Sequence, residues 1–196
     1  MNSIKYFYIA IAILFSSENS FSKDVIINQN NTDNIDVSDC ISFTIDSLSV
    51  LSYDQLEHLD VKWQTIEDIM LNKPINDCIY WYKIQIDNEL DGHFLFFDDP
   101  LIELIDVYFI SDSILIEKSS SGSSLNSNQR EVPINNYCFK LPKGSYTCYF
   151  RLEKKSNYHL PLKILSLDNI ILNEKNNNLF LGFYFGILLL FLIYNM

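Results

Sequence analysis

The most strongly apolar stretch of the chain lies at its C-terminal end. Residues 179–196 contain no charged side chain, and most of them are Leu, Ile, Phe or Tyr. About 18 apolar residues are the minimum for a helix that crosses a bilayer, and a helix satisfies its own backbone hydrogen bonds there. We therefore predict a transmembrane helix over 179–196. Because no Lys or Arg flank follows it, we expect it to be the first of several membrane helices, truncated at residue 196.

A second apolar segment lies at the N-terminus. The first five residues carry one positive charge, residues 6–15 are apolar but too short to span a membrane, and residues 16–22 are mostly small and polar. This order is typical of a secretory signal peptide, and Ser20 to Ser22 fits its cleavage site. An ordinary core helix is the alternative, but the segment lacks amphipathic periodicity. We predict that residues 1–22 are a signal peptide.

Between these two segments, apolar and polar residues alternate as they do in β-strands. Asp91-Gly92 and Pro142 to Ser145 are turn sequences that predict two hairpins. About eight short strands with frequent turns indicate an all-β fold, most simply a jelly-roll-like β-sandwich over residues 40–166. The expected strands are residues 41–45, 79–87, 93–97, 104–110, 114–117, 137–141, 146–152 and 162–165, with residues 48–53 as a further candidate.

Two other segments of the sandwich region have a different character. Thr65 with an acidic residue three positions later predicts the start of a helix of one or two turns, which ends before Pro74. Ser119 to Ser124 is rich in Ser and Gly, so we expect a loop there.

The segments that flank the sandwich join it to the two membrane signals. Residues 23–39 are rich in Asn and Asp, which predicts a flexible arm. Ser166 is expected to cap a helix that runs to Asn173 inside a tether of residues 167–178, and the Asn176–Asn178 run is expected to break or loosen this helix. So short a tether would pass a rigid-body shift of the sandwich to the membrane helix.

The charge balance excludes one class of partner. The chain carries 25 acidic and 14 basic residues, a net charge of −11. Binding to a nucleic-acid backbone requires the opposite sign, so we expect no nucleic-acid partner. Only Lys175 lies close before the membrane helix, and a flank with little positive charge is typical of the outside of a membrane. We therefore expect residues 23–178 to be extracytoplasmic.

The sequence contains four cysteines: Cys40, Cys78, Cys138 and Cys148. They form no CxxC motif and His is scarce, so no metal site is predicted. An oxidising compartment permits disulfides, and buried free thiols are the alternative. In the second predicted hairpin Phe139 lies opposite Cys148 while Cys138 points to the other face, which disfavours a Cys138–Cys148 bridge.

Several short motifs, taken in order along the chain, resemble a known family. Residues 80–88 read Tyr-Trp-Tyr-Lys-Ile-Gln-Ile-Asp-Asn, and further motifs lie at residues 104–108, 130–133, 137–144, 149–152, 160–162 and 182–195. Together they are similar to extracellular domain 2 and the start of the first membrane helix in seven-transmembrane receptors with diverse intracellular signalling modules (7TMR-DISM). The resemblance covers the chain from about residue 48 to its end.

The resemblance implies a jelly-roll sensor domain that looks like carbohydrate-binding modules. It also implies seven helices in the inner membrane of a bacterial cell, with the sensor on the periplasmic side and an output module in the cytoplasm. Such a sensor would bind a small-molecule ligand, for example a carbohydrate, with no cofactor. A receptor homodimer is a further expected partner.

The candidates for ligand contact are Trp81, Lys83, Arg130, Arg151, Tyr158 and His159. Trp81 would offer an aromatic platform to a sugar ring, although a Trp in a strand is more often part of the core. Lys83 stands where the family often has Arg. Tyr158 and His159 precede Pro161 in a loop, and loops carry binding sites more often than cores do.

The two arginines among these candidates have structural alternatives. Arg151 either forms an ion pair with an acid such as Asp106 or binds a carboxylate or hydroxyl group of a ligand. The sequence leaves both roles open. Arg130 lies next to Glu131, which favours a solvated ion pair.

The chain has no recognisable catalytic motif, so we expect no enzyme activity. It contains no Gly-x-Ser-x-Gly, HExxH or phosphate-binding loop. Asp98 and Asp99 form a tight acidic pair, but adjacent strand residues point to opposite faces, so they do not flank a cleft as glycosidase carboxylates do. We predict a ligand-sensing receptor domain that transmits a signal across the membrane. The alternative is a non-catalytic envelope protein-interaction, assembly or receptor-dimerisation module.

Overall fold

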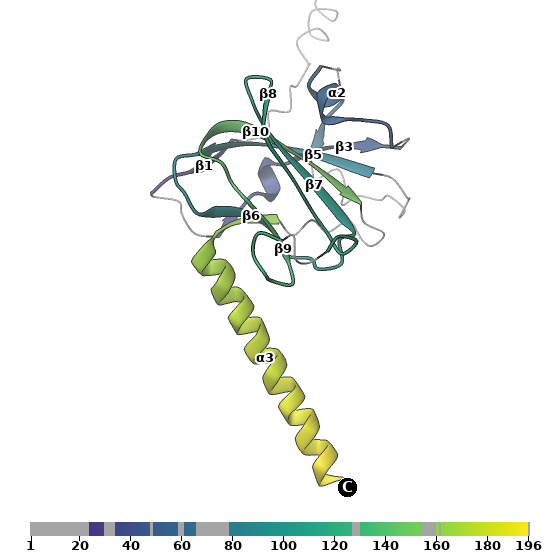
Figure 1. The fold of residues 1–196 in the computed structure, drawn as a ribbon, viewed down its shortest axis with the longest axis vertical. Helices are drawn as coiled ribbons and strands as arrows, with labels where there is room; N and C mark the ends of the chain where they lie inside the picture. Colours follow the sequence, from purple (N-terminus) through teal and green to yellow (C-terminus); the bar gives the residue numbers. More distant parts are fainter. Residues whose placement is uncertain are drawn as a thin grey trace, which may run out of the picture.

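The structure, a computed structural model, is a sandwich of two β-sheets followed by one long helix (Figure 1). It describes residues 24–29, 34–47, 49–58, 61–65, 79–126, 130–153, 160 and 162–195. The seven-stranded sheet contains β1 (Val25–Ile27), β3 (Ser42–Asp46), β4 (Gln64–Thr65), β5 (Ile79–Asn88), β7 (Leu104–Ser111), β8 (Ile114–Ser121) and β10 (Gly144–Glu153). The four-stranded sheet contains β2 (Ile35–Asp36), β6 (His93–Phe97), β9 (Tyr137–Lys140) and β11 (Leu162–Ser166). The helices are η1 (Ser38–Cys40), α2 (Tyr53–His58) and α3 (Leu167–Tyr194).

The core lies between the two sheets and is filled from alternate positions of the strands. In β5 the side chains of Tyr80, Tyr82, Ile84 and Ile86 all point into this core. Period-2 alternation places them on one face of the strand, as the sequence predicts. The all-β sandwich with a C-terminal apolar helix is therefore confirmed.

Each sheet also buries apolar side chains on its outer face. On the seven-stranded sheet, Trp81, Tyr108 and Tyr149 pack with Leu56 of α2. On the four-stranded sheet, Phe94, Phe96, Cys138 and Leu165 pack with Ile170 of α3. The layers therefore run from α2 through the large sheet and the small sheet to the start of α3, and α2 and α3 lie at opposite ends of the domain in Figure 1.

The two predicted hairpins are wrong, although their strands and turns are present. Strand β5 belongs to the large sheet while β6 pairs with β9 and β11 in the small one, and β9 is likewise separated from β10. Gly92 (φ 79°) and Gly144 (φ 106°) occupy the left-handed region, so both turns need glycine. The chain changes sheet at each turn because both faces of the core must be covered.

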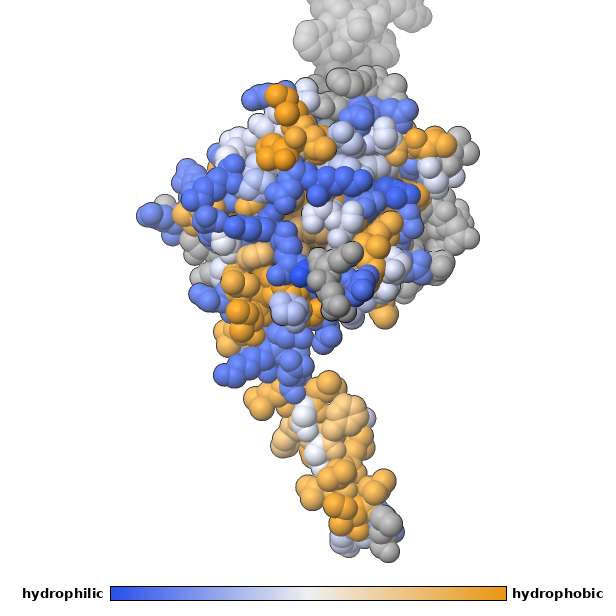
Figure 2. Space-filling model, in the orientation of Figure 1, coloured by the Kyte–Doolittle hydropathy of each residue, from blue (hydrophilic) through white to orange (hydrophobic). Residues whose placement is uncertain are grey.

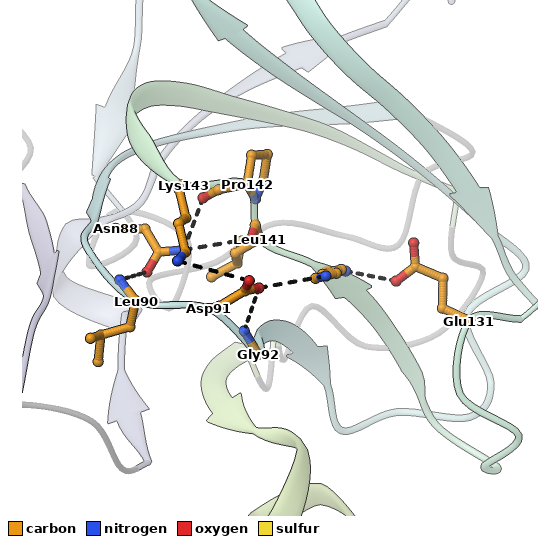
Figure 3. A network of polar contacts seen from close by, with 9 residues as sticks. Asn88, Leu90, Asp91, Gly92, Glu131, Leu141, Pro142 and Lys143 are labelled. Carbon is orange, nitrogen blue, oxygen red and sulfur yellow. Dashed lines mark hydrogen bonds and ion pairs between the residues drawn. The ribbon is translucent and has the colours of Figure 1, made fainter.

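The side chain of Asn88 ties these two crossovers together (Figure 3). Its amide donates to the carbonyl of Pro142 at 2.8 Å, and its carbonyl accepts from the backbone N–H of Leu90 at 3.2 Å. Asn88 is buried, so these bonds also satisfy polar atoms that are removed from water.

Asp91 adds an exposed charge network beside Asn88 (Figure 3). Its carboxylate lies 3.5 Å from Lys140 Nζ and 3.8 Å from Lys143 Nζ. A hydrogen bond from the backbone N–H of Gly92, together with the two lysines, lowers the pKa of Asp91. Because the pairs are solvated, their contribution to stability is small.

The flexible arm expected over residues 23–39 is wrong for its described residues, because they pack into the sandwich. β1 pairs in parallel with the end of β5, and β2 pairs with β11. Val25, Ile27 and Val37 are buried in the core. These apolar residues anchor the segment to the sandwich. They are hard to recognise in the sequence because the segment is rich in Asn and Asp.

Three local predictions in the sandwich need correction. The strand expected at 48–53 is wrong, because residues 49–52 lie in no strand and Tyr53 begins α2. Thr65 lies in β4 and pairs with Ser42, and the helix expected after it lies outside the described residues. Strand β8 continues to Ser121, into the expected Ser/Gly loop, because its residues on both sides of a bulge at Ile116 pair with β7. The signal peptide of residues 1–22 also lies outside the described residues.

Helix α3 begins where the sequence predicts but does not end there. The Ser166 hydroxyl accepts a hydrogen bond from the N–H of Asn169 at 3.4 Å and caps the helix. The helix then runs without interruption through Asn176–Asn178, so the predicted break is wrong. In the part of the chain that the structure describes, α3 is the one helix long and apolar enough to cross a membrane.

The described cysteines are free and buried. Cys138 lies on the outer face of the small sheet and Cys148 in the central core, so the predicted orientation on opposite sides is confirmed and no bridge joins them. Burial raises the pKa of Cys138 to about 12 and raises that of Cys148 as well. Cys40 is also buried and forms no disulfide. Thiols with raised pKa are poor nucleophiles, so they act as packing groups.

Candidate functional site

The outer face of the seven-stranded sheet carries a cluster of aromatic and cationic side chains. The strand register places Lys83 beside Tyr149, Tyr149 beside Tyr108, and Tyr108 beside Lys118, across four neighbouring strands. Two further rings come from outside this row, one from α2 and one from the residue before β4. We define the aromatic face as Tyr53, Trp63, Lys83, Tyr108, Lys118 and Tyr149.

The side chains of the aromatic face contact one another closely. The ring centroids of Trp63 and Tyr149 are 5.9 Å apart, and Lys83 Nζ lies 5.8 Å from each of these two centroids. Tyr53 stacks on Tyr108 with centroids 4.8 Å apart. A cation over an aromatic ring is attracted by about 0.5–1 kcal/mol at exposed sites, so Lys83 holds Trp63 against the sheet.

The accessible part of this face is formed by four side chains. Trp63, Tyr53 and Lys83 are half-buried and Lys118 is exposed, whereas Tyr108 and Tyr149 lie beneath them. Flat aromatic rings next to ammonium donors suit a ligand that has an apolar ring face and polar substituents.

Of the four predicted site residues that the structure describes, Lys83 alone takes part in this accessible surface. Trp81 is 1% exposed and lies in the cluster under α2, 5.7 Å from the ring of Tyr108. It is therefore a core residue, as the alternative role predicted, and its indole N–H has no hydrogen-bond partner among the described residues.

Arg151 is held by an ion-pair network on the same face of the sheet. Its guanidinium lies 3.3 Å from Asp106 and 2.7 Å from Glu153. Asp106 also accepts a hydrogen bond from Ser120 at 2.6 Å. Of the two roles considered for Arg151, the structure shows the ion pair with Asp106.

Arg130 lies away from the aromatic face and contacts its own loop. Its guanidinium lies 4.9 Å from the ring centroid of Tyr137 and donates to the carbonyl of Ile134 at 2.7 Å. Glu131 instead accepts from the backbone N–H of Lys140 at 2.8 Å, so the expected Arg130–Glu131 pair is wrong. Tyr158 and His159 lie outside the described residues.

Sequence reasoning missed the residues that complete the aromatic face. Trp63 lies between Lys62 and Gln64 in a polar stretch, and a large aromatic residue there is a signal for a ring that is accessible at the surface. Tyr149 was visible on the outward face of its strand, opposite the core residues. Lys118 is found only through the register of β8 with β7.

Comparison with known proteins agrees with the motifs. The family model described as 7TMR-DISM extracellular 2 matches residues 38–166, which is more than half of the chain. The match runs from η1 to the end of β11, so it leaves out β1 and β2, and it stops where α3 begins. A search of curated proteins finds no match. The chain therefore belongs to the 7TMR-DISM extracellular 2 family and contains the extracellular domain of a receptor of that family.

Proposed function

We propose that the sandwich is the periplasmic sensor domain of a bacterial multi-pass signalling receptor in the inner membrane. It binds a small molecule such as a carbohydrate and transmits the binding event across the membrane. The observation that carries this proposal is helix α3, which starts directly after β11 and continues unbroken into an apolar segment. A continuous helix moves as one body, so a displacement at the sandwich reaches the membrane.

The aromatic face is the ligand surface of this proposal. A sugar ring presents C–H groups on one face and hydroxyls around its rim. The half-buried rings of Trp63 and Tyr53 match the apolar face, and the ammonium groups of Lys83 and Lys118 can donate to the hydroxyls. Arg151, by contrast, is already paired with carboxylates.

We expect Trp63→Ala to weaken saccharide binding at least about ten-fold, which corresponds to roughly 1.4 kcal/mol. The variant removes the half-buried ring of Trp63 while the buried rings of Tyr108 and Tyr149 below it stay. Titration calorimetry of the chain in nanodiscs against a panel of mono- and oligosaccharides measures the effect. Lys62→Ala, an exposed neighbour, is the matched control and should leave the affinity unchanged. If a saccharide binds both variants equally well, its binding site does not include Trp63, and the aromatic face is not the ligand surface.

We propose binding rather than catalysis at this domain. The carboxylate of Asp98 accepts a hydrogen bond from Asn136 at 3.0 Å, and that of Asp99 accepts from the backbone N–H of Leu101 at 2.9 Å. Asp99 therefore stabilises the turn after β6, and Asp98 links the end of β6 to the start of β9. This arrangement gives each carboxylate of the acidic pair a structural contact.

A second candidate function is assembly of two receptor copies through strand β8. β8 is an edge of the large sheet and exposes Ile114 (68%), Leu115 (37%) and Ile116 (48%). An exposed apolar edge strand invites pairing with another strand. If two β8 strands pair antiparallel about a centre between Glu117 and Lys118, Glu117 of each copy lies opposite Lys118 of the other copy. This register places opposite charges side by side. Its two-fold axis is perpendicular to the sheet, so both α3 helices leave on the same side.

Ile116→Lys should lower the dimer fraction at least about ten-fold in this second function, because it places a charge at the apolar edge. Sedimentation of the detergent-solubilised chain measures the fraction. Ile26→Lys is the matched control, because Ile26 has the same 48% exposure and lies on β1. Equal dimerisation of both variants would exclude β8 as the interface.

A further inference from the structure

A polar pocket of about 190 Å³ lies between the four-stranded sheet and helix α3. The sandwich contributes Asp98, Asn136 and Lys163 to its wall, and α3 contributes Asn173, Glu174 and Asn177. We call this cavity, defined by these six residues, the junction pocket. Figure 2 shows hydrophilic residues at the level where the sandwich meets the helix, above the apolar part of α3.

The spacing of residues along α3 explains why the pocket forms here. Ile170, Asn173, Glu174 and Asn177 follow an i, i+3, i+4, i+7 pattern, so they share one face of the helix. Ile170 is 1% exposed and packs on the small sheet. This contact fixes the first turn of α3 against the sheet. The next two turns then face the sheet with polar side chains. A hydrogen bond of 3.1 Å from Asn135 to Glu174 fixes the second turn.

The charges around the junction pocket face one cavity but do not pair with each other. Among the described residues, Lys163 forms no ion pair with Asp98, Glu174 or any other carboxylate. One oxygen of Asp98 accepts from Asn136 and one oxygen of Glu174 accepts from Asn135, which leaves the second oxygen of each available. A cation and two anions around one cavity fit a ligand that carries both signs of charge.

We propose that the junction pocket binds a small zwitterion with a primary ammonium and an anionic group. The ammonium donates to the carboxylates of Asp98 and Glu174, while the anionic group accepts from Lys163 and from the amide groups of Asn173 and Asn177. A volume of about 190 Å³ equals about six water molecules, enough for a single amino acid or for phosphoethanolamine. The two sources of this chemistry are a free metabolite and the headgroup of a lipid beside α3.

This inference rests on the proposed function, because its consequence is regulation of signal transfer. The ligand would contact the sandwich and the helix at the same time. It therefore stabilises the position of the second and third turns of α3 against the sandwich. In this way the ligand controls the strength of the contact between the sandwich and the membrane helix.

Hydrogen exchange of the backbone amides at residues 170–177 tests the proposal in nanodiscs. In discs of phosphatidylcholine, whose quaternary ammonium has no N–H donor, L-alanine or O-phosphoethanolamine should slow exchange about ten-fold. If the lipid is the source, discs that contain phosphatidylethanolamine should show slow exchange without any added compound. No slowing in any of these three conditions would overturn the proposal.

Two variants assign an observed effect to the pocket. Lys163→Ala and Glu174→Gln should each lower the affinity for the added compound, read from the concentration that slows amide exchange, at least about ten-fold. Each variant removes one charged partner of the ligand. Lys62→Ala, at the other side of the sandwich, should respond like the natural chain. A full response in both pocket variants would overturn the proposal. Saccharide titration at the aromatic face is measured separately, so failure of the sensor function and failure of the junction pocket are distinguishable.

Discussion

Replacement of Phe150 by alanine is expected to lower the free energy of unfolding by about 3–5 kcal/mol. Phe150 is fully buried in the central core. Its ring stacks on Tyr82 at a centroid distance of 5.0 Å and meets Phe97 edge-on at 5.5 Å. Tyr82 belongs to the large sheet and Phe97 to the small one, so the alanine would leave a cavity where the two sheets are joined.

Urea unfolding of the detergent-solubilised chain, followed by tryptophan fluorescence, measures this loss of stability. Lys143→Ala is the control, because Lys143 is exposed and its ion pair with Asp91 is solvated. Its effect should stay within about 0.5 kcal/mol. A loss below about 1 kcal/mol for Phe150→Ala would contradict the packing described for this ring.

A flexible insertion in α3 is expected to abolish ligand-dependent output of the intact receptor. About ten Gly and Ser residues placed after Asn178 leave the docked turns and the junction pocket in place but interrupt the helix before its apolar segment. A flexible linker absorbs the displacement that a continuous helix transmits. Ligand affinity should therefore change by less than about two-fold, because the aromatic face is untouched.

The matched control replaces the flexible insertion by an Ala-rich helical one of about seven residues, nearly two full turns. This insertion keeps the helix continuous and nearly preserves its rotational phase, so it should retain most of the output. The output is measured on the cytoplasmic module of the receptor, and the affinity by titration of the same preparations. Full output from the flexible variant would show that the signal passes through other extracellular contacts.

The faces of the strands could be predicted from the sequence, but their partners could not. The large apolar residues of β9 and β10, such as Phe139 and Phe150, point into the core as period-2 alternation requires. Their turn contains a glycine with positive φ, as a hairpin would. A local turn sequence does not tell whether the next strand joins the same sheet, because that choice depends on which core surface remains uncovered.

The Asn176–Asn178 run shows a second limit of local reasoning. Asn has low helix propensity, so the run predicts a break. In the structure the docking of Ile170 and the long apolar segment on the other side keep the helix continuous. The helix propensities of ordinary residue types differ by about half a kcal/mol per residue. This difference is smaller than the stabilisation of a helix by tertiary packing.

The candidate site was predicted in part, for a related reason. Lys83 was found because it stands in the motif of residues 80–88 at the position where the family often has Arg, and the buried role of Trp81 was anticipated from its size. The partners of Lys83 come from distant parts of the chain, with Trp63 before β4 and Tyr149 on β10. Only the pairing of strands brings them together.

The order of strands has a consequence for how the protein is made. β10 lies between β5 and β7 in the large sheet, and β11 lies between β2 and β6 in the small one, yet among the described strands these two are the last to be synthesised. Neither sheet can close before they emerge, so most of the ectodomain remains an open chain during translocation. Because α3 follows β11 without a linker, folding of the sandwich and insertion of the membrane helix occur at the same stage of biogenesis.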